Sequence, residues 1–107
     1  MSANSSKIVQ TKQQQILALE EYLNIYKQRL VEVEVALNAL NRAKDKGEQS
    51  AFQILGANIL IKRSIDELID ELNQEKDILS KRIKGIEEQL IQLKKELREL
   101  TTKKSEE

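Results

Sequence analysis

Residues 49–63 read QSAFQILGANILIKR, and this stretch decides the fold. Two short segments rich in β-forming residues, 51–55 and 58–62, flank Gly56-Ala57. Glycine adopts the left-handed backbone of a tight turn at no steric cost. The pattern therefore predicts a β-hairpin over about residues 50–63.

The stretch before the hairpin, from about residue 7 to residue 46, contains neither Gly nor Pro. Its apolar residues recur in alternating steps of three and four, which is the seam of a coiled-coil helix. The seam consists of Ile16, Leu19, Leu23, Tyr26, Leu30, Val33, Leu37 and Leu40. A basic last turn and then Gly47 are typical of a helix C-terminus.

A second helix is predicted over about residues 65–103. Ser64 and Glu67 have the spacing of a capping box at its start. Its seam keeps the same period and consists of Ile65, Ile69, Leu72, Lys76, Leu79, Ile83, Ile86, Leu90, Leu93, Leu97 and Leu100. Because the connection is short and folds back, the helices must run antiparallel.

The sequence thus predicts a mainly α fold, a long antiparallel two-helix coiled coil joined by one short β-hairpin. We expect a single domain over residues 1–107. The register is open to within one heptad. A turn at Gly56-Ala57 brings Leu23 opposite Ile86. A neighbouring register brings Glu20 opposite Lys94 and Lys27 opposite Glu87, and such exposed charge pairs help to select a register.

Composition narrows the possible functions. The chain has no net charge, whereas a general polyanion-binding protein usually carries a basic excess, so no nucleic-acid partner is predicted. No apolar run is long enough to cross a bilayer, and the N-terminal MSANSSK lacks the apolar core of a signal peptide. We expect a soluble, cytoplasmic protein with no membrane partner.

Catalytic chemistry is not expected. The chain contains no His and no Cys, so the usual general bases, nucleophiles and transition-metal ligands are missing. No G-x-x-x-x-G-K-[ST] motif for phosphate binding occurs. The sequence predicts no enzymatic activity, no metal and no cofactor.

The predicted hairpin carries apolar side chains on both faces. They are Phe52, Ile54, Leu55, Ile59, Leu60 and Ile61. A lone two-stranded hairpin is marginal in water, and its open edges invite pairing with other chains. We therefore predict that these residues form a subunit interface in an oligomer. Further apolar residues off the seam either pack beneath the hairpin or are scattered surface residues: Val31, Val35, Ala36, Ala39 and Leu68.

This arrangement resembles the β-type prefoldin subunits. The residues that carry the resemblance are Ile54, Leu55, Gly56, Asn58, Leu60, Lys62, Glu67 and Leu68, followed by KDILSKRIKGIEEQLIQLKKELREL in the second helix. The family's α-type subunits have two hairpins between the helices, and this connection has room for one. The resemblance implies a hexamer of two α and four β subunits, whose hairpins build a β-barrel platform.

The resemblance also implies an ATP-independent holdase chaperone that captures unfolded polypeptides at the coiled-coil tips and delivers them to a group II chaperonin. The tips are the helix ends where both termini lie. The client-binding candidates there are Ile8, Val9, Leu17, Ile91, Leu97 and Leu100. Ile16, Leu90 and Leu93 are also nearby, and seam leucines normally pack on the partner helix. Lys12, within the seam, is expected to loosen packing at the tip.

Two other functions remain open from the sequence. A structural coiled-coil scaffold or assembly subunit, without general client binding, explains the heptads but not the two-faced apolar hairpin. A nucleic-acid-associated assembly factor is supported only by the modest basic excess of residues 1–63.

Overall fold

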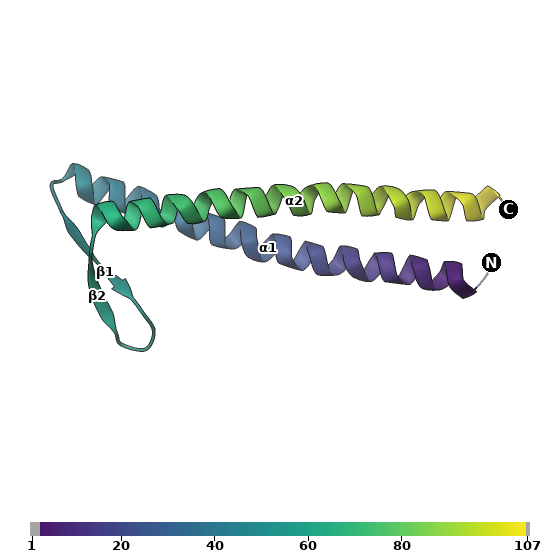
Figure 1. Ribbon diagram of the computed structural model, residues 1–107, viewed down its shortest axis with the longest axis horizontal. Coiled ribbons are helices and arrows are strands. Elements are labelled where there is room, and N and C mark those ends of the chain that lie inside the picture. The colour runs from purple at the N-terminus through teal and green to yellow at the C-terminus, as the bar shows by residue number, and fades with distance from the viewer. Residues whose placement is uncertain (1–2, 107) are drawn as a thin grey trace. The chain divides into compact units, whose positions relative to one another are not determined.

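The computed structural model describes residues 3–106. It contains four elements, shown in Figure 1: helix α1 (Ala3–Asp45), strands β1 (Ser50–Ile54) and β2 (Leu60–Ser64), and helix α2 (Ile65–Glu106). The predicted helix–hairpin–helix fold is confirmed. Both helices extend a few residues beyond the predicted ends, because no Gly or Pro near either terminus interrupts them. The predicted domain limits at residues 1 and 107 lie outside the described part.

Helix α1 ends in a Schellman motif built around Gly47. The Gly47 N–H donates to the Lys44 carbonyl at 2.9 Å, and the Glu48 N–H donates to the Ala43 carbonyl at 3.0 Å. These are the two bonds that define the motif. Gly47 has a φ of 88°, a left-handed conformation that side chains with a Cβ rarely adopt. The expected stop at this glycine is confirmed.

Helix α2 begins directly at the end of β2. Its N-cap is Ser64, whose Oγ accepts a hydrogen bond from the Glu67 N–H at 3.4 Å. The Ile65 N–H donates to the Gln49 carbonyl at 3.0 Å, and Lys44 Nζ lies 2.7 Å from Asp66 Oδ1. These contacts tie the end of α1 to the start of α2 and fix both ends of the hairpin.

The two strands pair antiparallel, with Ser50 opposite Ser64 and Ile54 opposite Leu60. The turn is one residue longer than Gly56-Ala57. Gly56 has a φ of 116° and Asn58 a φ of 66°, and the Ile59 N–H donates to the Gly56 carbonyl at 3.3 Å. Asparagine tolerates the left-handed region better than most residues, so Asn58 completes the turn.

The chain divides into two compact units. The hairpin unit is Gln28–Ser80, and the terminal unit comprises the residues up to Lys27 together with those from Lys81 onward. The buried residues of the hairpin unit are Val33, Leu37, Ile65, Leu68 and Leu79, and those of the terminal unit are Ile16, Ile83 and Leu90. All except Leu68 are predicted seam residues, so each unit has the expected core between antiparallel helices.

Two glycine substitutions should have opposite effects on stability. Gly47→Ala should lower the free energy of unfolding by about 1–2 kcal/mol, because alanine is strained in the left-handed region. Gly85 lies within α2, and an added Cβ there would meet no atom within 4 Å. Gly85→Ala should therefore raise the free energy by about 1 kcal/mol through helix propensity. Urea unfolding followed by circular dichroism measures the free energy of unfolding of both variants. Equal changes of the same sign in the two variants would contradict the helix-end geometry.

Candidate functional site

The hairpin exposes apolar side chains on both faces. Phe52, Ile54 and Leu60 lie on one face and are 68%, 74% and 60% exposed. Side chains alternate along a strand, so Leu55, Ile59 and Ile61 lie on the other face, where they too are exposed. All six predicted interface residues are thus uncovered by the chain's own helices. Large apolar side chains exposed together on one short hairpin indicate an interaction surface.

Both edges of the hairpin also carry backbone groups that point outward. The Leu55 N–H donates to the Ile59 carbonyl at 2.9 Å, which makes these two residues a hydrogen-bonded pair. Such pairs alternate with non-hydrogen-bonded ones in an antiparallel ladder. The peptide groups of Phe52 and Ile54 in β1, and of Leu60 and Lys62 in β2, therefore point to the two edges. Either edge can accept a further strand.

A groove of about 380 Å³ lies beside the hairpin within the hairpin unit. Its lining is mostly small or apolar, with charged residues at one end: Ala36, Ala39, Leu40, Ala51, Phe52, Gln53, Leu68, Leu72, Glu71, Glu75 and Arg29. Leu68 is buried there, as expected for a residue that packs beneath the hairpin. Val31 and Val35 are 59% and 63% exposed and do not line the groove, so for these two the surface interpretation holds.

Arg63 connects the hairpin to α2. Its Nη1 donates to Gln53 Oε1 at 2.9 Å, and its Nη2 donates to Glu71 Oε1 at 2.5 Å. A second carboxylate, on Glu67, lies 3.7 Å away. One side chain therefore joins both strands to the first turns of α2.

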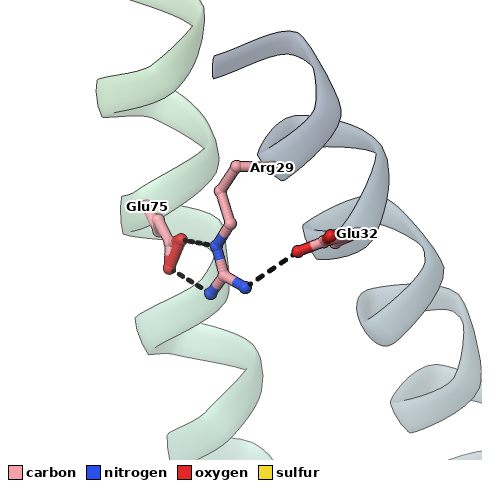
Figure 2. A network of polar contacts seen from close by, with 3 residues as sticks. All are labelled: Arg29, Glu32 and Glu75. Atoms are coloured by element: carbon pink, nitrogen blue, oxygen red, sulfur yellow. Dashed lines mark hydrogen bonds and ion pairs between the residues drawn. The ribbon is translucent and has the colours of Figure 1, made fainter. Parts of the chain in front are cut away.

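Arg29 and Glu75 form a two-bond ion pair across the helices of the hairpin unit, as Figure 2 shows. Arg29 Nε and Nη2 donate to the two Glu75 oxygens at 2.7 and 2.8 Å. A longer contact of 3.5 Å joins Arg29 to Glu32. The hydrogen bonds and positive charge of Arg29 lower the pKa of Glu75 below its usual value. This planar, paired geometry is the strongest form of carboxylate recognition by arginine.

Within the terminal unit, ion pairs lie on one side of the helix seam. Lys94 Nζ lies 3.7 Å from Glu20, and Lys27 Nζ lies 3.8 Å from Glu87. Both are charge pairs that the sequence analysis named as possible. Leu17 is one helical turn from Glu20, and Ile91 is one turn from Lys94, so both flank this charged side.

The other side of the seam in the terminal unit has a groove of about 500 Å³. Its lining residues are Gln15, Ala18, Leu19, Gln89, Gln92 and Leu93. Farther toward the termini, Lys12 Nζ donates to Glu96 Oε2 at 2.6 Å. The sequence analysis missed this partner of Lys12, and the expected loosening of the tip stays a prediction. Hydrogen bonds from Lys12 and Gln92 lower the pKa of Glu96.

The client-binding candidates differ in exposure. Leu17 and Ile91 are 63% and 69% exposed, and Ile8 is also exposed. Val9, Leu97 and Leu100 are half-buried. Ile16 and Leu90 are buried in the seam, and Leu93 is half-buried. The structure therefore brings Leu17 and Ile91 to the surface of the terminal unit, and their role in client binding stays a prediction.

Among residues 3–106, no group of three or more His, Cys, Asp or Glu side chains is placed to hold a metal ion. Over the same described residues, no helix is both long and apolar enough to span a membrane.

The sequence profile of the prefoldin subunit family matches residues 4–106. The chain belongs to the prefoldin subunit family. Prefoldin subunits are chaperone or scaffold components rather than enzymes, and they assemble with other prefoldin subunits. Among solved structures, the prefoldin beta subunit from Thermococcus strain KS-1 is similar, at 24% identity over 89% of this chain and 87% of that chain, with a TM-score of 0.45. No curated protein sequence matches the chain.

Three features of this prefoldin-family chain escaped the sequence analysis: the Arg63 contacts, the Arg29–Glu75 pair and the glutamine-lined groove. Arg29, Glu75 and the groove glutamines occupy heptad positions beside the seam. Which of them face one another across the helices depends on a register that the apolar pattern leaves open. Charged residues placed symmetrically beside the two seams were the available signal. Arg63 gave no signal, because its partners depend on how the hairpin folds onto α2.

The Arg29–Glu75 pair should contribute modestly and in a pH-dependent way. A double-mutant cycle with Arg29→Met and Glu75→Gln should give a coupling of about 0.5–1 kcal/mol near neutral pH, because both side chains are partly exposed. A carboxyl whose folded-state pKa is lowered stabilises the fold above its unfolded pKa of about 4.3. The coupling should disappear as pH falls through the lower folded-state value.

Glu32→Gln supplies the matched control for this cycle. Its contact with the same arginine is longer and involves a single bond, so its coupling should be smaller. Equal coupling for Glu32 and Glu75 would contradict the geometry in Figure 2.

Proposed function

We propose that this chain is a β-type prefoldin subunit that acts as an ATP-independent holdase chaperone. In this role, the hairpin joins the chain to other subunits, and the terminal unit holds unfolded polypeptides. The observation that carries the proposal is the hairpin itself, whose six large apolar side chains are all exposed on two faces of one two-stranded ladder.

The energetic argument for assembly is direct. Burying apolar surface contributes roughly 25 cal/mol per Å², and a hairpin with exposed apolar residues on both faces leaves most of that contribution unrealised. Added strands would also satisfy the outward-pointing peptide groups of β1 and β2. Hairpins from several subunits can supply both the strands and the apolar cover, which supports a platform of paired hairpins. The resemblance to the family adds the proposed stoichiometry, a hexamer with two α-type and four β-type subunits.

The argument for client binding rests on the terminal unit. Leu17 and Ile91 are exposed apolar residues that do not contribute to the seam. One such pair would bind an unfolded chain weakly, and several subunits in one oligomer would gain by effective concentration. Cytoplasmic location and delivery to a group II chaperonin belong to the same proposal and rest on the resemblance to the family.

A scaffold or assembly subunit without general client binding is the second candidate. The contact of Lys12 with Glu96 favours this scaffold function. The pair joins the two helices near the termini, where separated helices would have exposed apolar seam residues to a client. The two candidates share the hairpin interface and differ in what the terminal unit does.

Charge introduced into the hairpin should abolish assembly. Native mass spectrometry of the chain mixed with a candidate α-type subunit from the same cell should give a hexamer. Phe52→Asp and Ile61→Asp should each prevent it, since a carboxylate buried between strands has no partner. Val35→Asp is the matched control, because Val35 is at least as exposed as Ile61 and nearly as exposed as Phe52, but lies on α1 outside the hairpin. Assembly that survives both hairpin variants would remove the basis of the proposal.

Holdase activity should be measurable without nucleotide. The assembled protein should suppress aggregation of chemically denatured citrate synthase, and the double variant Leu17→Ser/Ile91→Ser should suppress it less because its apolar contacts are lost. An assembly that forms normally but leaves aggregation unchanged would favour the scaffold function.

A further inference from the structure

The hairpin carries positive charge and no carboxylate. Residues 49–63 contain Lys62 and Arg63 but neither Asp nor Glu. Arg63 finds its counter-charge within the chain, because it pairs with Glu71 on α2. Lys62 is exposed, and it makes no ion pair within the part of the chain that the structure describes. One uncompensated positive charge therefore lies on β2.

Lys62 lies beside an open edge, on the face of the hairpin where every side chain is exposed. It stands directly opposite Phe52 in the ladder, and Ile54 and Leu60 share its face. Its peptide group points away from β1, toward the edge where a further strand would pair. A strand added at this edge would therefore place one of its own side chains next to Lys62, on the side away from Phe52.

A second copy of β2 is a poor partner for this edge. Because β2 spans Leu60–Ser64, two copies paired antiparallel over their full length would put Lys62 opposite Lys62 of the second copy. Like charges directly opposite one another destabilise a ladder. A shift by two residues would move the second lysine only to the diagonal position, and it would shorten the ladder. Lysine on an edge strand is a common means of preventing such self-pairing.

Strand β1 of a second copy would avoid this repulsion but would not satisfy the charge. In the register of the hairpin itself, it would place Phe52 opposite the lysine. No residue of β1 (Ser50–Ile54) is negatively charged. Covering an ammonium group without a partner is costly, whereas an opposite charge directly across the ladder stabilises the pairing. Neither strand of this chain can supply that opposite charge.

We infer that Lys62 selects the subunit that pairs with β2, and that this partner is a strand of a different chain with Asp or Glu opposite Lys62. The inference rests on the proposed function, since it concerns the hairpin interface of the same oligomer. It makes the two edges unequal. The uncharged β1 edge accepts a second copy of this chain, whereas the β2 edge is reserved for the acidic strand.

Charge reversal at Lys62 tests this selection. The fluorescently labelled full-length chain is titrated with a candidate α-type subunit. Lys62→Glu should weaken binding roughly tenfold, because a cross-strand attraction becomes a repulsion, and Lys62→Met should have a smaller effect. The control is Lys84→Glu, which makes the same charge change at an exposed position of α2 outside the hairpin. Added salt should reduce the difference between Lys62→Glu and its control.

A second measurement needs only this chain. The unaltered chain and Lys62→Glu are mixed in equal amounts, and the average mass is measured by light scattering. The mixture should be heavier than either chain alone at the same total concentration, because β2 of one version can then pair with β2 of the other through opposite charges. Mixing the unaltered chain with Lys84→Glu should leave the average mass unchanged.

Each outcome decides a different claim. If Lys62→Glu binds the α-type subunit as well as its control does, the acidic partner is wrong. If mixing adds no mass, the exclusion of a second β2 is wrong. In both cases the hairpin interface stands as long as Phe52→Asp prevents assembly. If the unaltered chain does not bind the α-type subunit, or if Phe52→Asp assembles normally, the proposed function fails and this inference fails with it.

Discussion

The structure depends on a hairpin that cannot be stable alone. Two strands with apolar side chains on both faces and peptide groups along both edges are marginal in water. The chain stabilises this element from its ends: the Schellman motif at Gly47, the N-cap at Ser64 and the Lys44–Asp66 pair fix where the strands begin and end. Arg63 then fixes how the hairpin lies on α2. What remains uncovered is a surface suited to other subunits.

The residues that flank the helix seam differ between the two units. In the hairpin unit, Ala36, Ala39 and Leu68 lie beside the strands, and the Arg29–Glu75 ion pair joins the two helices beside the seam. The terminal unit keeps the same seam but changes what flanks it. Two ion pairs lie on one side, and the glutamine-lined groove lies on the other, next to the Lys12–Glu96 pair. The seam maintains the fold, while the flanking positions are free to vary.

Much of this fold could be predicted from the sequence for local reasons. The unbroken heptads predict both helices, and Gly47 and Ser64 mark their ends through backbone geometry and capping that need no distant partner. The predicted turn was one residue too short. Asn58 belongs to it, because it adopts a left-handed conformation, which asparagine reaches more often than most other residues.

The register and the side-chain contacts across the seam were harder to predict. Leucine and isoleucine recur in every heptad, so a slip by one heptad buries an equivalent set of residues. Only the charge pairs distinguish the alternatives, and Glu20–Lys94 and Lys27–Glu87 do so in the terminal unit. The partner of Lys12 was missed for the same reason, since Glu96 is evident only once the helices are aligned.

The central claim is that other subunits cover both edges of this hairpin. Hydrogen exchange of the outward-pointing amides tests it most directly, measured by NMR or mass spectrometry for the chain alone and after mixing with an α-type subunit. The amides of Phe52, Ile54, Leu60 and Lys62 should exchange rapidly in the chain alone and slowly in the assembly, because added strands accept their hydrogen bonds. Equally rapid exchange of these four amides in an assembled complex would contradict the account.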